Sequence, residues 1–150
     1  MFYNINFILP NTYDSFFYKI VNNTNLCSEF FYFEETKIIT ENLNTVDLDC
    51  KVYTYGEIKD VLSQRQYIVF LKCSIFSKRN NPNDRYPASL DEFLKSRINT
   101  MVFITDVQFV HVITKEKQIC EQLLNNASNY NFSDLTVYKN SIGNNFFDFK

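Results

Sequence analysis

The sequence predicts an α+β fold, with a mixed and mostly antiparallel sheet of six or seven strands on which three or four helices pack. The first supporting observation is the region 100–137, where two runs rich in β-branched and aromatic residues precede a run with helical spacing. Only the turn around Asp106 separates the two strand-like runs, which indicates a hairpin. The second is the run 66–76, which is apolar on both faces, as is typical of a central strand.

The length and composition indicate a single domain over residues 1–150. Hydrophobic residues make up 45% of the chain and aromatic residues 17%, which supplies a core and excludes a disordered chain. A chain of this size buries about 70% of the surface that its unfolded form exposes. With 15 basic and 17 acidic side chains the formal charge is −2, so there is no excess positive charge for phosphates and we expect no nucleic acid partner.

The N-terminal part predicts a strand, a helix and two short strands. Apolar and polar residues alternate over 2–9, which indicates a strand with one buried face. A helix of about three turns should start near Asp14. Its apolar residues fall at helical spacing: Tyr13, Phe16, Phe17, Ile20 and Val21. Residues 29–33 and 36–40 are each typical of a short strand, and the polar residues 41–49 predict a loop.

Two segments in the middle of the chain, 54–57 and 89–92, match the capping box. In this motif a Thr or Ser and a Glu three residues later bind backbone amides at a helix start. The second helix has three apolar residues that we expect to face inward: Leu90, Phe93 and Leu94. Between the two helices, we expect the strand 66–76 to lie in the centre of the sheet with Phe70 in the core.

After the hairpin, Thr114 is placed to cap a further helix. One face of that helix carries apolar residues at helical spacing: Ile119, Cys120, Leu123, Leu124 and Ala127. Residues 135–138 and 145–149 predict edge strands.

The sequence predicts neither a metal site nor a cofactor. The cysteines are scattered, with no CxxC pair and no histidine nearby: Cys27, Cys50, Cys73 and Cys120. The only two glycines, Gly56 and Gly143, cannot form the glycine-rich loop that holds a nucleotide phosphate.

The N-terminus lacks the pattern of a signal peptide, and no run approaches the ~18 apolar residues of a membrane span. We therefore expect a cytoplasmic protein with reduced thiols and no contact with a membrane.

The residues that could carry out catalysis each have a structural explanation. His111, the only histidine, shares a strand face with Phe109, which is typical of a core or edge residue, and a general base needs a positioned partner. Cys73 and Cys120 lie in apolar runs, where a thiol behaves as a small hydrophobe. Asp106 suits a hairpin turn. We therefore predict no catalytic residue.

Five segments spread over most of the chain share a pattern of apolar and turn positions: 6–13, 89–94, the hairpin with Asp106, 121–127 and 131–133. This pattern resembles a domain family of unknown function from low-GC Gram-positive bacteria. Members of that family are small single-domain proteins without an assigned activity. The resemblance thus implies a bacterial, cytosolic protein and assigns no site residues. Residues 141–147 differ from the more charged tail expected of the family.

The function that these observations favour is a non-enzymatic protein-binding module, such as an immunity or inhibitor protein. The alternatives are a small hydrolase or transferase whose site is assembled only in the fold, and a phage or mobile-element accessory protein. We expect the surface loop 77–87 to contact the partner, through residue types that are enriched at interface hot spots: Arg79, Arg85 and Tyr86. A solvated connection between strand and helix is the plainer interpretation of this loop.

Overall fold

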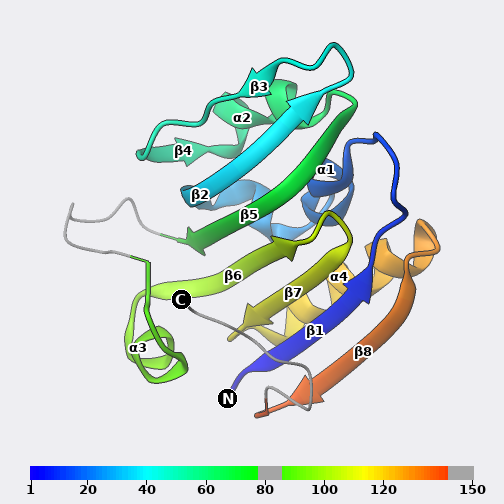
Figure 1. The fold of residues 1–150 in the computed structure, drawn as a ribbon. Coiled ribbons are helices and arrows are strands. Elements are labelled where there is room, and N and C mark those ends of the chain that lie inside the picture. The colour runs from blue at the N-terminus through cyan, green and yellow to red at the C-terminus, as the bar shows by residue number, and fades with distance from the viewer. Residues whose placement is uncertain (78–85, 142–150) are drawn as a thin grey trace.

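A computed structural model of the chain describes residues 1–77 and 86–141 (Figure 1). In this part of the chain eight strands form one sheet, in the order β3-β2-β5-β6-β7-β1-β8 with β4 also paired to β2, and neighbouring strands run antiparallel. Four α-helices and a short 3-10 helix (η1) connect the strands, which confirms the predicted α+β fold. The elements are β1 (Tyr3–Ile8), α1 (Phe16–Val21), η1 (Asn25–Ser28), β2 (Phe30–Thr40), β3 (Thr45–Val46), β4 (Val52–Thr54), α2 (Tyr55–Leu62), β5 (Gln66–Phe76), α3 (Leu90–Lys95), β6 (Ile98–Thr105), β7 (Phe109–Thr114), α4 (Lys117–Asn129) and β8 (Ser133–Lys139).

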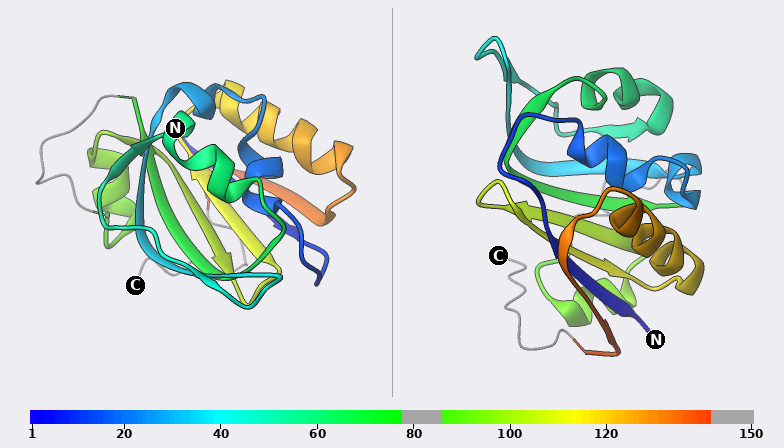
Figure 2. Two further views of the ribbon diagram at one scale, coloured as in Figure 1. Left: turned by 90° about the horizontal axis from the view of Figure 1, so that it is seen from above. Right: turned by 90° about the vertical axis from the view of Figure 1, so that its right-hand side faces the viewer.

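The described helices cover the two faces of the sheet unequally. Helices α1, α2 and α4 lie along one face, here called the helix face, and form the larger core with it (Figure 2). The opposite face, here called the open face, carries Phe70, Phe103 and Phe109. Of the described helices only α3 packs on it, where Phe93 joins a smaller core at one end of the strands. The end that carries Phe109 is therefore left without a described helix.

Strand β5 lies between β2 and β6 and has the predicted bounds. Its register with β2 shifts between Ile68 and Phe70, so that Val69 is an extra residue, a β-bulge. Ile68 and Leu71 on either side face the larger core, which leaves Phe70 half-buried on the open face. The prediction that Phe70 belongs to the core is wrong for this reason.

Residues 30–40 form one strand instead of the two predicted. A register shift between Phe33 and Glu35 marks a second bulge, located at the polar residues that suggested a break. Two very short strands, β3 and β4, pair with β2 between residues 45 and 54, where the sequence predicted mainly loop. Strands of two or three residues have no period that a pattern could show. The strand predicted at 145–149 lies outside the described residues.

Helix α1 is shorter than predicted. It begins at Phe16 and has six residues. Asp14, expected in its first turn, instead forms an isolated β-bridge with Gln66 through two backbone hydrogen bonds of 3.1 Å. Tyr13 packs its ring against that of Tyr67, with 5.2 Å between the centroids. Pairing with β5 thus delays the helix start.

The capping boxes form to different extents. At α2, Thr54 Oγ1 accepts a hydrogen bond from the Glu57 amide, and the Glu57 carboxylate accepts one from the Thr54 amide, as predicted. At α3, Ser89 Oγ accepts from the Glu92 amide, but the Glu92 carboxylate accepts from the amide of Ala88. The second box is therefore only half formed.

Two further helix details differ from the prediction. Leu94 of α3 is 39% exposed, because the helix turns Phe93 toward the sheet instead. Glu116, not Thr114, is the N-cap residue of α4, and Thr114 Oγ1 accepts a hydrogen bond from the Glu116 amide. The apolar face of α4 is confirmed, except that Leu124 is only half-buried.

Strands β6 and β7 form the predicted hairpin, and its tip has an unusual backbone. Asp106 and Val107 both have left-handed conformations, with φ of 47° and 70°, which a β-branched residue rarely adopts. The Val107 amide donates to the Val69 carbonyl in the β5 bulge at 3.2 Å, and the Leu9 amide donates to the Gln108 carbonyl at 2.8 Å. The tip is therefore tied to strands on both sides.

The larger core yields a first prediction. Phe17 is fully buried and packs edge-on against Phe31 and Phe33, so Phe17→Ala should lower the free energy of unfolding by about 3–5 kcal/mol. The matched control is Phe70→Ala, which removes the same side chain from a half-exposed position and should cost clearly less. Denaturant unfolding of both variants measures the difference, and equal losses would contradict the assignment of Phe70 to the open face.

The hairpin tip yields a second prediction. A left-handed conformation costs a residue other than glycine about 1–2 kcal/mol, and glycine avoids this cost but loses about 0.5–1 kcal/mol of backbone entropy. Val107→Gly should therefore raise the free energy of unfolding by about 0.5–1 kcal/mol. The check is urea unfolding beside Val107→Ala, which should gain less. A loss of stability in the glycine variant would show that the tip is not strained.

Candidate functional site: the open face of the sheet

The strand registers align side chains of the open face in rows across five strands. The row nearest the hairpin tip, here called the outer row, takes one residue each from β1, β7, β6, β5 and β2: Ile8, Phe109, Thr105, Phe70 and Lys37. The next row, here called the middle row, takes its residues from the same strands in the same order: Asn6, His111, Phe103, Lys72 and Glu35.

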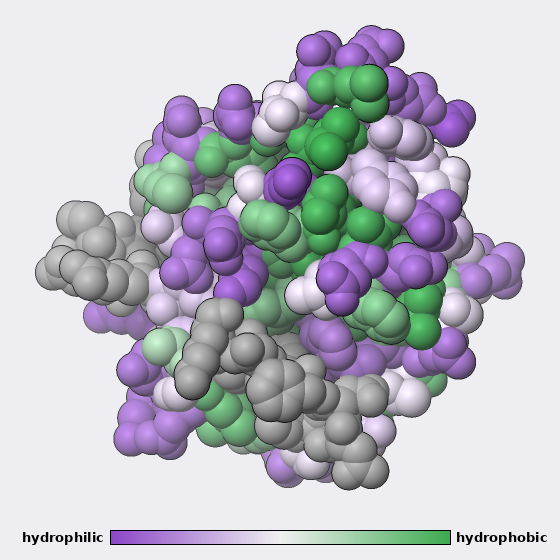
Figure 3. All heavy atoms as spheres, in the orientation of Figure 1, coloured by the Kyte–Doolittle hydropathy of each residue, from purple (hydrophilic) through white to green (hydrophobic). Residues whose placement is uncertain are grey.

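The outer row exposes apolar side chains. Phe109 is 42% exposed, and Ile8 and Phe70 are half-buried. Ile39 on β2, two residues beyond Lys37, is also half-buried. Figure 3 views this face and shows a band of hydrophobic side chains across it, between hydrophilic ones. We call Ile8, Ile39, Phe70 and Phe109 the apolar patch. Exposed apolar side chains that adjoin one another mark contact sites far more often than single ones do.

The middle row is polar at both ends. His111 Nδ1 lies 2.5 Å from Asn6 Oδ1, so the imidazole donates from Nδ1 to the amide oxygen. Burial lowers the pKa of His111, which keeps the ring neutral near pH 7. At the other end, the Lys72 ammonium lies 3.5 Å from the Glu35 carboxylate. Phe103, which is 3% exposed, separates the two polar pairs. The hydrogen bond to Asn6 orients the His111 ring and adds no charge beside it.

The buried thiols do not lie near His111. Cys73 and Cys120 belong to the larger core on the helix face, whereas His111 lies on the open face of the sheet. Burial raises the pKa of both thiols, so neither is a ready nucleophile. A Cys–His catalytic pair between these residues is therefore excluded by the fold.

Of the three residues predicted to contact a partner, the structure describes only Tyr86. Arg79 and Arg85 lie outside the described residues. Tyr86 is 9% exposed, and its ring packs edge-on against Phe103 with 5.8 Å between the centroids. The expectation that Tyr86 lies at the surface is wrong, because the residue belongs to the smaller core. A binding role for the loop stays a prediction.

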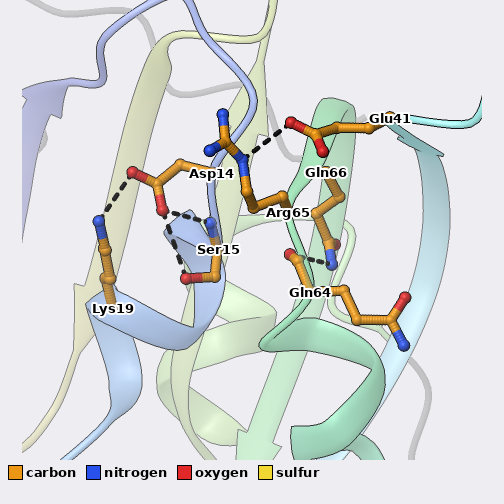
Figure 4. Close-up of polar contacts among 7 residues, drawn as sticks. All are labelled: Asp14, Ser15, Lys19, Glu41, Gln64, Arg65 and Gln66. Carbon is orange, nitrogen blue, oxygen red and sulfur yellow. Dashed lines mark hydrogen bonds and ion pairs between the residues drawn. The ribbon is translucent and has the colours of Figure 1, made fainter.

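Polar side chains also gather where the segment before α1 meets the start of β5 (Figure 4). The Asp14 carboxylate accepts hydrogen bonds from the Ser15 amide and the Lys19 ammonium, both at 2.7 Å. Burial opposes ionisation of Asp14, but these two bonds outweigh it and lower the pKa of the carboxyl group. The exposed Arg65 and Glu41 form an ion pair at 2.8 Å. The bonds of Asp14 to Ser15 and Lys19 fix the start of α1, and the Arg65–Glu41 pair links the end of β2 to the start of β5. Both contacts have a structural role.

Two kinds of site are not found in the described chain. Over residues 1–77 and 86–141, no group of three or more His, Cys, Asp or Glu side chains is placed to hold a metal ion. None of the helices in these ranges has the length and apolar character needed to cross a membrane.

The described chain is thus an α+β protein whose open sheet face carries an apolar patch beside a polar row. Residues 3–146 match the family of proteins of unknown function DUF2691. Because the match covers nearly the whole chain, the protein belongs to this family, and the resemblance to a domain family of unknown function is confirmed. No curated protein and no solved structure matches the chain.

The buried imidazole yields a third prediction. The unfolded chain takes up a proton on His111 near the ordinary pKa of about 6.5, whereas the folded protein, with its lowered pKa, does so only at lower pH. His111 therefore removes stability as the pH falls below about 6.5. In His111→Gln, the decrease in the free energy of unfolding between about pH 7.5 and 5.5 should be smaller than in the wild type. Equal decreases in urea unfolding would show that the imidazole is not shielded.

Proposed function

We propose that this protein is a non-enzymatic protein-binding module, of the kind that acts by covering a protein partner, as immunity and inhibitor proteins do. The observation that supports the proposal is the apolar patch. It brings together four exposed or half-exposed side chains from four strands, at the end of the open face that no described helix covers: Ile8, Ile39, Phe70 and Phe109.

The energetics of the patch suit a protein contact. Removing apolar surface from water is worth about 25 cal/mol per Å², so two phenylalanines and two isoleucines on one surface favour association. Their backbones are fixed by strand pairing and, at Phe70, by a bulge whose carbonyl is hydrogen-bonded to the hairpin tip. A surface fixed in this way loses little conformational entropy on binding.

The surroundings of the patch resemble the rim of a protein interface. Lys37 and Asp106 lie beside the patch and are exposed, and the Lys72–Glu35 pair borders it in the middle row. An apolar centre with a charged and polar rim is the usual arrangement at protein–protein contacts. The formal charge of −2 supports a protein over a nucleic acid as the partner. The proposal includes the bacterial cytoplasm as its setting.

The described residues favour this function over a small hydrolase or transferase. His111 bonds to the Asn6 amide, and Cys73 and Cys120 lie on the other side of the sheet. The Asn6 amide orients the imidazole but adds no negative charge that would raise its basicity. A nucleophile needs a base within reach, and the sheet separates both thiols from His111. The middle row is therefore better suited to form the polar border of a contact surface than to act as a catalytic site.

The fourth prediction tests the patch. Phe109→Asp places a charge in its centre and should weaken binding to a protein partner by about tenfold or more. The matched control is Val137→Asp on the edge strand β8, where the native side chain is 41% exposed, compared with 42% for Phe109. Wild type and both variants would be immobilised and used to capture proteins from a lysate of the source cells, after circular dichroism has shown equal folding.

The expected result is a partner retained by the wild type and Val137→Asp and lost by Phe109→Asp. Equal retention by all three proteins, or the absence of any retained protein, would overturn the proposal.

A further inference from the structure

We propose that the C-terminal residues 142–150, here called the tail, pack along the middle row of the open face and cover Asn6, His111 and Phe103. The tail lies outside the described residues. Support comes from the burial of the row, from the place where β8 ends and from the sequence of the tail. The middle row borders the apolar patch, so this contact forms whether or not a protein partner binds the patch.

The first supporting observation is the burial of a polar side chain on the open face. Asn6 is 4% exposed, whereas Phe109 in the outer row of the same face is 42% exposed. Of the described helices only α3 packs on this face, in the smaller core at one end of the strands, and Asn6 does not belong to that core. The described residues therefore do not account for the cover over Asn6.

The second observation is a buried hydrogen-bond donor on the same side chain. Asn6 Oδ1 accepts the bond from His111 Nδ1, but Asn6 Nδ2 is buried and has no hydrogen-bond partner among the described residues. Leaving a buried donor without an acceptor costs free energy, so such groups are rare in folded proteins. A segment of polypeptide that crosses the row would bring backbone carbonyls, which are strong acceptors.

The third observation is the place where the described chain ends. The Asn140 amide donates to the Phe2 carbonyl at 2.8 Å, and Asn140 Oδ1 accepts from the Phe2 amide at 3.0 Å. These bonds fix the end of β8 against β1. Asn140 has a left-handed conformation, with φ of 56°, which turns the chain away from the direction of the strand. The tail therefore starts from a fixed point that lies two strands from His111.

The tail is long enough to reach the middle row. Along β1, Phe2 and Asn6 are about 13 Å apart at about 3.3 Å per residue, and β8 and β7 are about 10 Å apart across the sheet. The path from Asn140 to His111 is thus about 16 Å, and that to Phe103 on the next strand is about 19 Å. An extended chain spans about 20 Å from residue 140 to 146 and about 23 Å to 147.

The sequence of the tail suits this surface. Its apolar side chains include three aromatic rings, those of Phe146, Phe147 and Phe149. Aromatic rings pair favourably with one another, and His111 and Phe103 supply two rings in the row. The segment 78–85, which also lies outside the described residues, has only charged and polar side chains and one proline, and it follows β5, three strands from β1. The tail is therefore the better cover for Asn6.

The contact can be weak and still persist, because the tail and the sheet belong to one chain. A short segment joined to its site has an effective concentration there of about 1 mM. If the same segment as a free peptide has a Kd of about 0.1 mM, the attached tail covers the row about nine-tenths of the time. The exposed side chains of the apolar patch stay available to a partner.

The fifth prediction removes the rings from the full-length protein. In one variant, here called the tail variant, serine replaces Phe146, Phe147 and Phe149. Loss of the cover should change the amide chemical shifts around Asn6 and His111 and leave those of α2 unchanged. Burial lowers the pKa of His111 in the wild type, so in an NMR titration this pKa should rise toward the ordinary value of about 6.5 in the tail variant.

The matched control is Asn144→Ser together with Asn145→Ser, which changes the tail but keeps its three rings. It should leave both the shifts and the pKa of His111 at their wild-type values. The charged groups of the same row, Lys72 and Glu35, lie two and three strands from His111 and are the same in both variants. They therefore do not explain a difference between the two titrations.

A measurement on the wild type needs no variant. Nuclear Overhauser contacts arise only between protons that are close in space, and the ring protons of Phe146 or Phe147 should show them to the rings of His111 or Phe103. In addition, a peptide of residues 141–150 should reverse the shift changes of the tail variant with a Kd of about 0.1–1 mM. The same peptide with serine in place of its phenylalanines should not.

Three results would overturn the inference. The first is a wild type without contacts between the rings of the tail and those of the row. The second is a folded tail variant that keeps the wild-type shifts and the wild-type pKa of His111. The third is an equal change in the Asn144→Ser, Asn145→Ser control.

Discussion

The unequal covering of the two sheet faces by the described helices is the constraint on which the rest of this structure depends. Helices α1, α2 and α4 bury the apolar residues of the helix face, and the short α3 buries one end of the open face. The strands extend beyond α3, and their apolar residues continue with them to Phe70 and Phe109. At this end of the sheet, the described part of the chain leaves apolar side chains partly exposed. Burial of such side chains drives both folding and association, so this end favours contact with another molecule.

At this end of the sheet, the conformation of the backbone turns Phe70 to the open face. The bulge at Val69 lets Ile68 and Leu71 both face the larger core while Phe70 turns to the open face. The hairpin tip bonds to that bulge through Val107, which is held in a left-handed conformation. Strained backbone persists where surrounding bonds enforce it, and it is concentrated at functional sites. The bulge, the tip and the apolar patch thus form one local arrangement.

The sequence predicts the elements well and the surface poorly, and each failure has a physical cause. Alternation and helical spacing locate β5, the hairpin and α4, because each depends on its own side chains. The orientation of Phe70 depends on a bulge set by pairing with β2, and the burial of Tyr86 depends on Phe103 from a distant strand. Ile8 and Phe109 have no unusual sequence context, and only the register joins them. Residue type alone therefore favoured the 77–87 loop as the contact surface.

The measurement that tests the central claim most directly is a comparison of amide chemical shifts by NMR before and after addition of the protein captured from the lysate. If the apolar patch is the protein-contact surface, the shifts should change around Ile8, Ile39, Phe70 and Phe109 and stay constant on α2 and α4. Shifts that change on the helix face instead, or that stay constant everywhere, would contradict the account.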